Sequence, residues 1–221
     1  MQIPKDIEQN YRGLLDHVDT WFRRCLEAGG TAFACRAGCS ACCRGLFDIT
    51  LLDAHLLQRA FASLPHDTRD EIRVKCEVRL QELQGQWPDL RPPYLLNALP
   101  EKAWTEMPED DETPCPLLDM QGLCLVYHAR PLPCRLHGLP NIDVSGADFE
   151  GTLCTLHQGN PLQLPDKILR WRFHDLFTEE ARLMRAFYQH LTGRAIAELD
   201  TFIPLALLAD YQQVDWQQVL S

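Results

Sequence analysis

Four cysteines lie within nine residues of this sequence, at Cys35, Cys39, Cys42 and Cys43, in the spacing C-x3-C-x2-C-C. If the segment is helical, positions i, i+4, i+7 and i+8 place all four sulfurs on one face. Thiolates that converge in this way are ligands of soft metal ions and of iron–sulfur clusters. Four buried structural residues are the alternative, although alanine would fill such positions without the risk of oxidation. A disulfide ladder is not favoured, because the vicinal cysteines cannot readily bridge each other.

A second group of cysteines follows at Cys115, Cys124, Cys134 and Cys154. The sequence Asp119-Met120-Gln121-Gly122 is typical of a turn, and it is expected to fold Cys124 back toward Cys115. The two groups together supply eight sulfurs. Eight sulfurs could complete two four-sulfur sites, or one such site plus structural or redox thiols.

The compartment decides whether such cysteines are oxidised or bind metal. Residues 1–30 carry acidic side chains throughout and no uninterrupted apolar segment, which argues against a secretory signal. No stretch elsewhere approaches about 18 uncharged apolar residues, so no membrane partner is expected. We expect a cytoplasmic protein, and a reducing cytosol favours metal-binding or catalytic cysteines over structural disulfides.

Length and charge set further bounds. The 221 residues are 46% hydrophobic and can bury a substantial core. We expect a single domain over 1–221, with a cysteine-cluster core at about 33–160 and a C-terminal helical region at about 165–221. The formal net charge of −10 argues against a nucleic-acid partner, because phosphate binding requires a basic surface. The acidic segment 106–112 lacks the ligand spacing and turn glycine of a calcium loop, so a solvated loop is expected there.

Apolar spacing predicts helices that flank and connect the cysteine groups. A helix over about 7–27 would bury Cys25 on its apolar face and end at Gly29-Gly30. Thr50 resembles the N-cap of a helix that runs to Leu64. Asp67 is expected to cap the next helix, which runs to Gly85. The face of that helix is formed by Ile72, Cys76, Leu80 and Leu83. Cys25 and Cys76 are therefore assigned to the core, and the helices of 50–86 are expected to form a hairpin that brings the two cysteine groups together.

The C-terminal part is also predicted to be helical. A long helix follows Pro165-Asp166 and ends at Gly193, with Thr178 as a candidate break. A last helical region, from Ala195 to Leu220, would bend at Pro204. Strands and helices do not alternate along the chain. The predicted fold class is therefore mainly α, a helical domain around an irregular cysteine-rich metal-binding centre.

The combined cysteine pattern resembles a known family. The C-x3-C-x2-C-C run is followed by C-P-L-L, G-x-C and Y-x-x-R-P-x-x-C-R. This pattern, over about 35–154, is similar to the YkgJ-like cysteine-cluster family, a zinc- or iron-chelating domain that includes the flagellin lysine N-methylases. The resemblance implies metal ligation by Cys35, Cys39, Cys42, Cys43, Cys115, Cys124 and Cys134, with Cys154 as an eighth ligand. Tyr127, Arg130, Pro131 and Arg135 match the positions that accompany these cysteines, and Tyr127, Arg130 and Arg135 are candidates to contact the cofactor.

The spacing of the sulfurs also separates the candidate cofactors. Zinc prefers isolated tetrahedral sites built from two short cysteine knuckles, whereas the first group crowds four sulfurs together. This favours an iron–sulfur cofactor, one or two [4Fe–4S] clusters, with zinc as the alternative. The two histidines beside Cys134, His128 and His137, are not assigned as ligands. Arg130 and Arg135 could donate charge-assisted hydrogen bonds to thiolates; an ordinary salt bridge is the alternative for Arg130.

The first three cysteines, Cys35, Cys39 and Cys42, also have the spacing with which radical S-adenosylmethionine enzymes hold a cluster. Those enzymes are β/α barrels, and this chain lacks their rhythm of strands. Two function classes follow. The first is a cluster enzyme or redox protein that acts on a protein or small molecule, with methyl transfer among its candidate reactions. The second is a noncatalytic, zinc-stapled protein-interaction module, whose metal would be closed by four protein ligands.

Overall fold

The structure is a computed structural model that describes residues 2–36, 38–100, 111–149, 154, 156 and 166–218. It confirms the predicted mainly α fold. The helices are α1 (Lys5–Gly29), α2 (Leu51–Ala62), α3 (His66–Gln86), α5 (Leu132–Leu136), α6 (Asp166–Leu169), α7 (Phe173–Thr192) and α8 (Ile203–Leu208), with 3-10 turns at Gly30–Ala32, Leu96–Ala98 and Tyr127–Ala129. The strands are β1 (Asp48–Thr50), β2 (Asn141–Ile142), β3 (Asp148–Phe149) and β4 (Asp200–Phe202).

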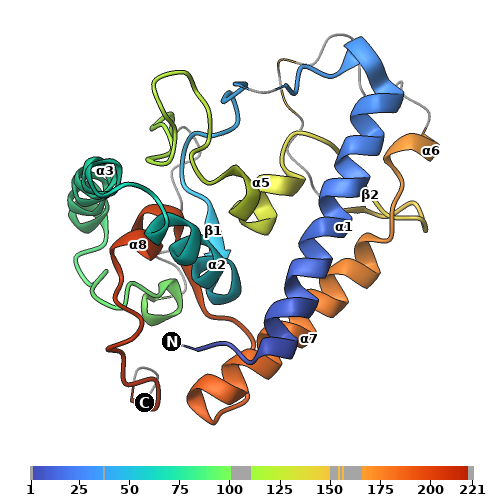
Figure 1. Cartoon of the computed structure of the whole chain (residues 1–221). Coiled ribbons are helices and arrows are strands. Elements are labelled where there is room, and N and C mark those ends of the chain that lie inside the picture. Colours follow the sequence, from blue (N-terminus) through green and yellow to red (C-terminus); the bar gives the residue numbers. More distant parts are fainter. Residues whose placement is uncertain are drawn as a thin grey trace.

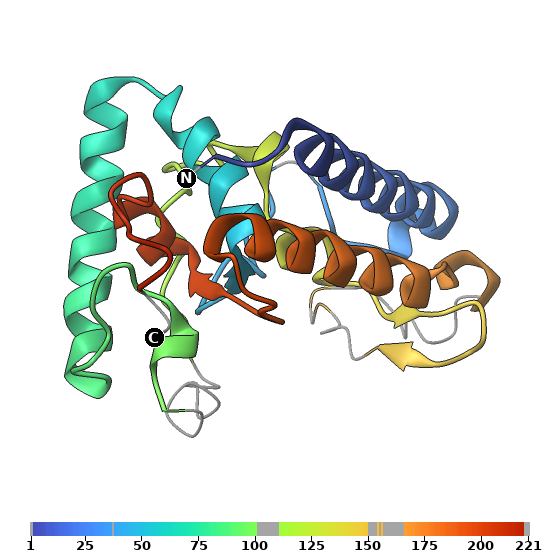
Figure 2. The same cartoon turned by 90° about the horizontal axis from the view of Figure 1, so that it is seen from below.

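The long helices α1 and α7 lie side by side and antiparallel (Figures 1 and 2). The apolar stripe of α1 is buried, and its Trp21 packs edge-on against Phe173 at 4.9 Å between ring centroids. The indole nitrogen of Trp21 donates a 2.9 Å hydrogen bond to the carbonyl of Leu169, which ties α1 to α6. Cys25 is fully buried on the same stripe, as its helical spacing predicted. Within the described residues, none of the helices combines the length and apolar character needed to cross a bilayer.

The two helices after the first cysteine group agree with their sequence signals at most positions. Thr50 caps α2, since its side chain accepts a hydrogen bond from the amide of Asp53. The predicted cap of α3 is wrong: Pro65 precedes the helix, and Asp67 lies inside the first turn. The helix also continues past Gly85 to Gln86. Cys76 is fully buried on α3, and α8 packs against both α2 and α3 (Figure 1).

The C-terminal region differs from its prediction. The break falls between α6 and α7, at 170–172, and Thr178 lies within the continuous helix α7. Gly193 ends α7 in the left-handed conformation at φ 71°, as expected from its position. The predicted helix from Ala195 to Leu220 is wrong, because Asp200–Phe202 form strand β4 and only Ile203–Leu208 are helical among the described residues of this region. Pro204 therefore sits in the first turn of α8, where its missing N–H costs no hydrogen bond.

Strand β4 pairs antiparallel with β1, which immediately precedes α2. The pairing sets Asp48 opposite Phe202 and Thr50 opposite Asp200. It thus brings the acidic residues of two distant segments to one short ribbon beside α5. The acidic segment 106–112 lies outside the described residues except for Asp111, which pairs with Arg79, and Glu112, whose carbonyl accepts a hydrogen bond from Arg44.

Candidate metal centre

The first cysteine group lies in consecutive turns and not in a helix. The amide of Cys39 donates to the carbonyl of Arg36, and the amide of Cys43 donates to the carbonyl of Ser40, each at 3.0 Å. Within the first of these turns, Gly38 adopts a positive φ of 80°, which suits a residue without a side chain. The shared helical face considered from the sequence is therefore absent from the described part of this segment, and the turns set the directions of the sulfurs.

Main-chain pairing joins the two cysteine groups directly. The amide of Cys115 donates to the carbonyl of Cys43 at 2.9 Å, and the amide of Gly45 donates to the carbonyl of Thr113 at 2.9 Å. Gly45 has φ 78°, and a Cβ there would lie 2.9 Å from the carbonyl oxygen of Asp111. This close approach requires glycine. The contact expected from a helical hairpin over 50–86 is thus made by a β-bridge between the loops themselves.

The predicted turn at Asp119–Gly122 is confirmed. The amide of Asp119 donates to Leu123 at 3.0 Å and that of Leu125 to Leu117 at 2.9 Å, so the chain reverses and returns Cys124 toward Cys115. Gly122, at φ 77°, lies against the first cysteine group, because a Cβ there would be 3.1 Å from the carbonyl oxygen of Gly38. The hairpin therefore packs its tip onto the first group while its base carries two cysteines of the second.

The electrostatic neighbours of the thiols divide the eight cysteines into two sets of four. In one set, the thiols of Cys154, Cys42 and Cys39 add to burial, the largest effect, in raising the pKa of Cys35 to about 11. Cys154 is held there by its amide, which donates to the carbonyl of Gly138 at 3.2 Å. We call this set the outer four: Cys35, Cys39, Cys42 and Cys154.

The other set, which we call the inner four, consists of Cys43, Cys115, Cys124 and Cys134. Burial first, and then the thiol of Cys115, raises the pKa of Cys134 well above its ordinary value, and Cys124 contributes in the same direction. Cys115 and Cys134 also raise the pKa of Cys43. The two sets meet at Cys42 and Cys43, where a hydrogen bond between the side chains lowers the pKa of Cys42 and raises that of Cys43.

The donor set fits a soft metal by its chemistry. All ten cysteines are free thiols, and eight of them gather in the two sets. Among the described residues, no three His, Cys, Asp or Glu side chains stand at the spacing needed to hold one metal ion. Metal binding would therefore have to draw the thiols of each set closer together while it deprotonates the sulfurs.

Arg130 places a positive charge near thiols of both sets. It opposes the rise that burial causes in the pKa of Cys35, Cys124 and Cys134, and it adds to the hydrogen bond from Cys43 in lowering the pKa of Cys42. Its guanidinium carbon lies 3.7 Å from the ring centroid of Tyr127, and one of its nitrogens is 3.4 Å from a carboxylate oxygen of Asp19. The salt bridge, one of the two alternatives for Arg130 at the level of sequence, is therefore present, and hydrogen bonds from Arg130 to thiolates stay a prediction.

Arg135 holds the backbone around the centre. Its side chain is 3% exposed and donates to the carbonyl of Arg130 at 2.7 Å and to that of His128 at 2.8 Å. It also pairs with Asp19. A direct contact of Arg135 or Tyr127 with a cofactor stays a prediction. His128 is exposed, and His137 packs edge-on against Phe47 at 5.3 Å between ring centroids.

Asp19 is a residue that sequence reasoning missed. It lies on α1, and its partners Arg130 and Arg135 are 111 and 116 positions away along the chain. Nothing in the local sequence distinguishes it from the other acids of α1. The carboxylate joins both arginines and so attaches the Tyr127–Arg135 segment, with its cysteine, to the long helix.

Asp53 is a second missed residue, and it positions α5. Its side chain is 1% exposed and accepts a 3.1 Å hydrogen bond from the amide of Leu132, the first residue of the helix that carries Cys134. Burial, only partly offset by Tyr11 and the Leu132 amide, raises the pKa of Asp53 to about 7. The folded state thus holds a proton that the unfolded chain releases near pH 4.

The raised pKa of Asp53 predicts that the stability of the folded state falls as the pH rises. Because the pKa is higher in the folded state, the charged form destabilises the fold, and the loss grows as the pH rises from about 4 through about 7. Asp53→Asn keeps an acceptor for Leu132 and removes the titration. We expect urea unfolding of reduced, metal-free protein to show a smaller loss of stability from pH 5 to pH 8 in this variant, by roughly 2–3 kcal/mol. The exposed Asp67→Asn should match the wild type, and equal pH profiles for all three proteins would contradict the prediction.

The comparisons with known proteins agree with the cysteine pattern. The family model CxxCxxCC, described as "Putative zinc- or iron-chelating domain", matches residues 34–152, more than half of the chain. No curated protein and no solved structure is significantly similar to the chain.

Proposed function

The chain belongs to the CxxCxxCC family of zinc- or iron-chelating domains, and from this membership we propose that it is an iron–sulfur protein with two [4Fe–4S] clusters. The outer four and the inner four cysteines would each hold one cluster. The observation that carries this proposal is that the fold brings the two cysteine groups into contact. The amide of Cys115 donates to the carbonyl of Cys43 at 2.9 Å, and a Cβ at Gly138 would lie 3.7 Å from the Cβ of Cys154 and 4.0 Å from the sulfur of Cys35. Four thiolates are the usual ligand set of a [4Fe–4S] cluster.

The surrounding residues suit such a ligand set. Thiolate ligation builds up negative charge, and Arg130 faces thiols of both sets with its guanidinium. Hydrogen bonds and nearby cations of this kind set the reduction potential of a cluster. Bound clusters would supply electron transfer. We place the protein in the reducing cytoplasm, where it would act in redox or methyl-transfer chemistry on a protein or small molecule.

A zinc-stapled protein-interaction module is the second candidate function. It is supported by an apolar groove of about 800 Å³ between α3 and the Asp119–Gly122 hairpin, lined in part by Cys115. Val74, Val78 and Met120 line this groove and are 60%, 51% and 97% exposed. Zinc on the inner four cysteines would then fix the loops that present this surface to a partner protein.

Anaerobic purification followed by metal and sulfide analysis separates the two functions. The iron–sulfur proposal predicts brown protein with about eight irons and about eight acid-labile sulfides per chain, because each four-cysteine set would hold a four-iron cluster. An absorption spectrum with charge-transfer bands should accompany them and bleach on reduction. Colourless protein with stoichiometric zinc and no sulfide, prepared without oxygen, would overturn the proposal in favour of the zinc module.

A further inference from the structure

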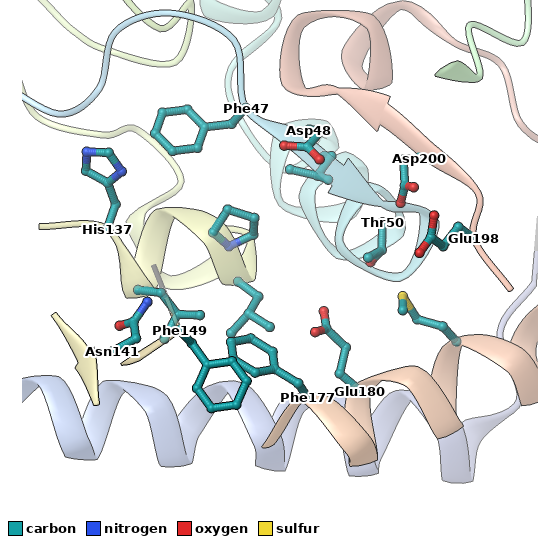
Figure 3. Close-up of a pocket in the computed structure, with 15 residues that line it drawn as sticks. Phe47, Asp48, Thr50, His137, Asn141, Phe149, Phe177, Glu180, Glu198 and Asp200 are labelled. Atoms are coloured by element: carbon teal, nitrogen blue, oxygen red, sulfur yellow. The ribbon is translucent and has the colours of Figure 1, made fainter. Parts of the chain in front are cut away.

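A cavity of about 760 Å³ lies beside α5, between the β1–β4 ribbon and α7 (Figure 3). It borders the metal centre, because Pro133, the neighbour of Cys134, is part of its wall. Its volume falls within the range of small-molecule sites.

One end of the cavity is acidic. Four carboxylates line it, those of Asp48, Glu180, Glu198 and Asp200, and none of its described lining residues is Lys or Arg. Figure 3 shows Glu180 rising from α7 toward the carboxylates that the β1–β4 pairing assembles. Burial, together with Asp48 and Glu198, raises the pKa of Asp200 to about 7. The described part of the wall thus gathers four carboxyl groups and supplies no cation to pair with them.

Glu180 enters the acidic end of the cavity from α7 (Figure 3). Burial, followed by repulsion from Asp53 and Asp200, raises the pKa of Glu180 to about 8. Tyr11 lowers the pKa of both Glu180 and Asp53, but its hydroxyl forms no hydrogen bond with a described residue. Asn141, another wall residue, is 6% exposed, and its side-chain oxygen has no hydrogen-bond partner among the described residues. The wall therefore presents acceptors that a donor on an occupant could satisfy.

The other end of the cavity is apolar and aromatic. Phe149 and Phe177 lie 5.3 Å apart between ring centroids, and Leu136 and Met184 also belong to the wall. The remaining ionisable ring, that of His137, has its pKa lowered by burial, which favours the neutral form. An occupant must therefore combine positive charge with an apolar body.

We propose that this cavity binds a linear aliphatic polyamine. The ammonium groups of a polyamine can form ion pairs with several carboxylates. Its methylene chain can pack against Phe149 and Phe177, and an ammonium group can lie over the face of one ring. A bare divalent cation would use the acidic end alone. A neutral chain would leave the carboxylates without partners. The proposal does not depend on which metal the cysteines hold.

Calorimetric titration of the purified, metal-loaded protein with spermidine tests the proposal, at physiological ionic strength so that nonspecific attraction is screened. We expect one spermidine per chain. The double variant Glu180→Gln with Asp200→Asn should weaken binding at least tenfold, and Phe177→Ala should weaken it less. Asp175→Asn, an exposed position on the same helix α7, is the matched control and should bind as the wild type does.

The amide variants should fold, because burial disfavours the charged forms of both carboxyl groups, and unchanged circular dichroism and melting temperature would establish this. Octane-1,8-diol and Mg²⁺ are the competing probes. Equal binding of spermidine to the folded double variant would overturn the proposal, as would displacement of spermidine by the diol. Stoichiometric displacement by millimolar Mg²⁺ would assign the cavity to a divalent cation instead.

Discussion

Replacing Cys134 by Ser is expected to lower the metal content to about half and the melting temperature by about 10 °C. Cys134 lies on α5, and its pKa is raised by burial and by its neighbour Cys115, so it stands inside the inner four. That set joins segments that are far apart in sequence, since Cys43 and Cys115 are already linked through their main chains. Metal bound across such segments contributes its binding free energy to folding. A loss of about 3 kcal/mol corresponds to roughly 6–12 °C in a chain of this size.

The control variants for this experiment are Cys25→Ala and Cys76→Ala. Both residues are fully buried, and helical periodicity explains their positions, so both variants should keep the full metal content. Cys76 is the sharper test, because the thiol of Cys115 contributes, after burial, to raising its pKa. Loss of metal from either control would show that the division into eight ligands and two core cysteines is wrong. A Cys134→Ser protein with unchanged metal and melting temperature would exclude a ligand role for Cys134.

Asp19→Ala is expected to destabilise the protein by about 2–3 kcal/mol. The substitution leaves the guanidinium of Arg135, which is 3% exposed, without its carboxylate. Removing one partner of a fully buried ion pair costs about 3–5 kcal/mol, and the expected loss is smaller because Asp19 itself is 31% exposed. Equilibrium urea unfolding of the wild type and the variant measures the difference.

Asp16→Ala, one turn earlier on α1, is the matched control for Asp19→Ala. Asp16 is exposed, so its variant should lose less than about 0.5 kcal/mol. Equal stability of the Asp19 and Asp16 variants would contradict the role assigned to Asp19. Because Arg130 keeps its stacking on Tyr127 in the Asp19 variant, the metal content should remain close to that of the wild type.

The local sequence predicted the helices and turns that depend on interactions within a few residues. The period of α1 placed Cys25 in the core, and Thr50 at the start of α2 forms its cap, because each signal acts within a few residues. The turn at Asp119–Gly122 follows in the same way from glycine at a positive φ. The cysteine spacing and the family pattern identified the residues of the metal centre, whose ligand roles stay predictions.

Interactions between distant segments decided the features that the local sequence did not predict. Asp200–Phe202 form a strand because they pair with β1. The residues around Pro204 in the sequence cannot reveal this pairing. The same pairing assembles the acidic cavity, and Asp19 finds its arginines more than 100 residues away.

The sequence by itself determined which side chains can ligate metal, since thiol chemistry belongs to the residue. The division of the eight cysteines into two sets depends on the bridge between Cys43 and Cys115 and on the place of Cys154 at Gly138, and only the tertiary structure decides such contacts. The physical reason is the distance along the chain over which each effect acts. Capping, turns and helical periods act over a few positions, whereas burial and charge depend on every segment that folds against the site.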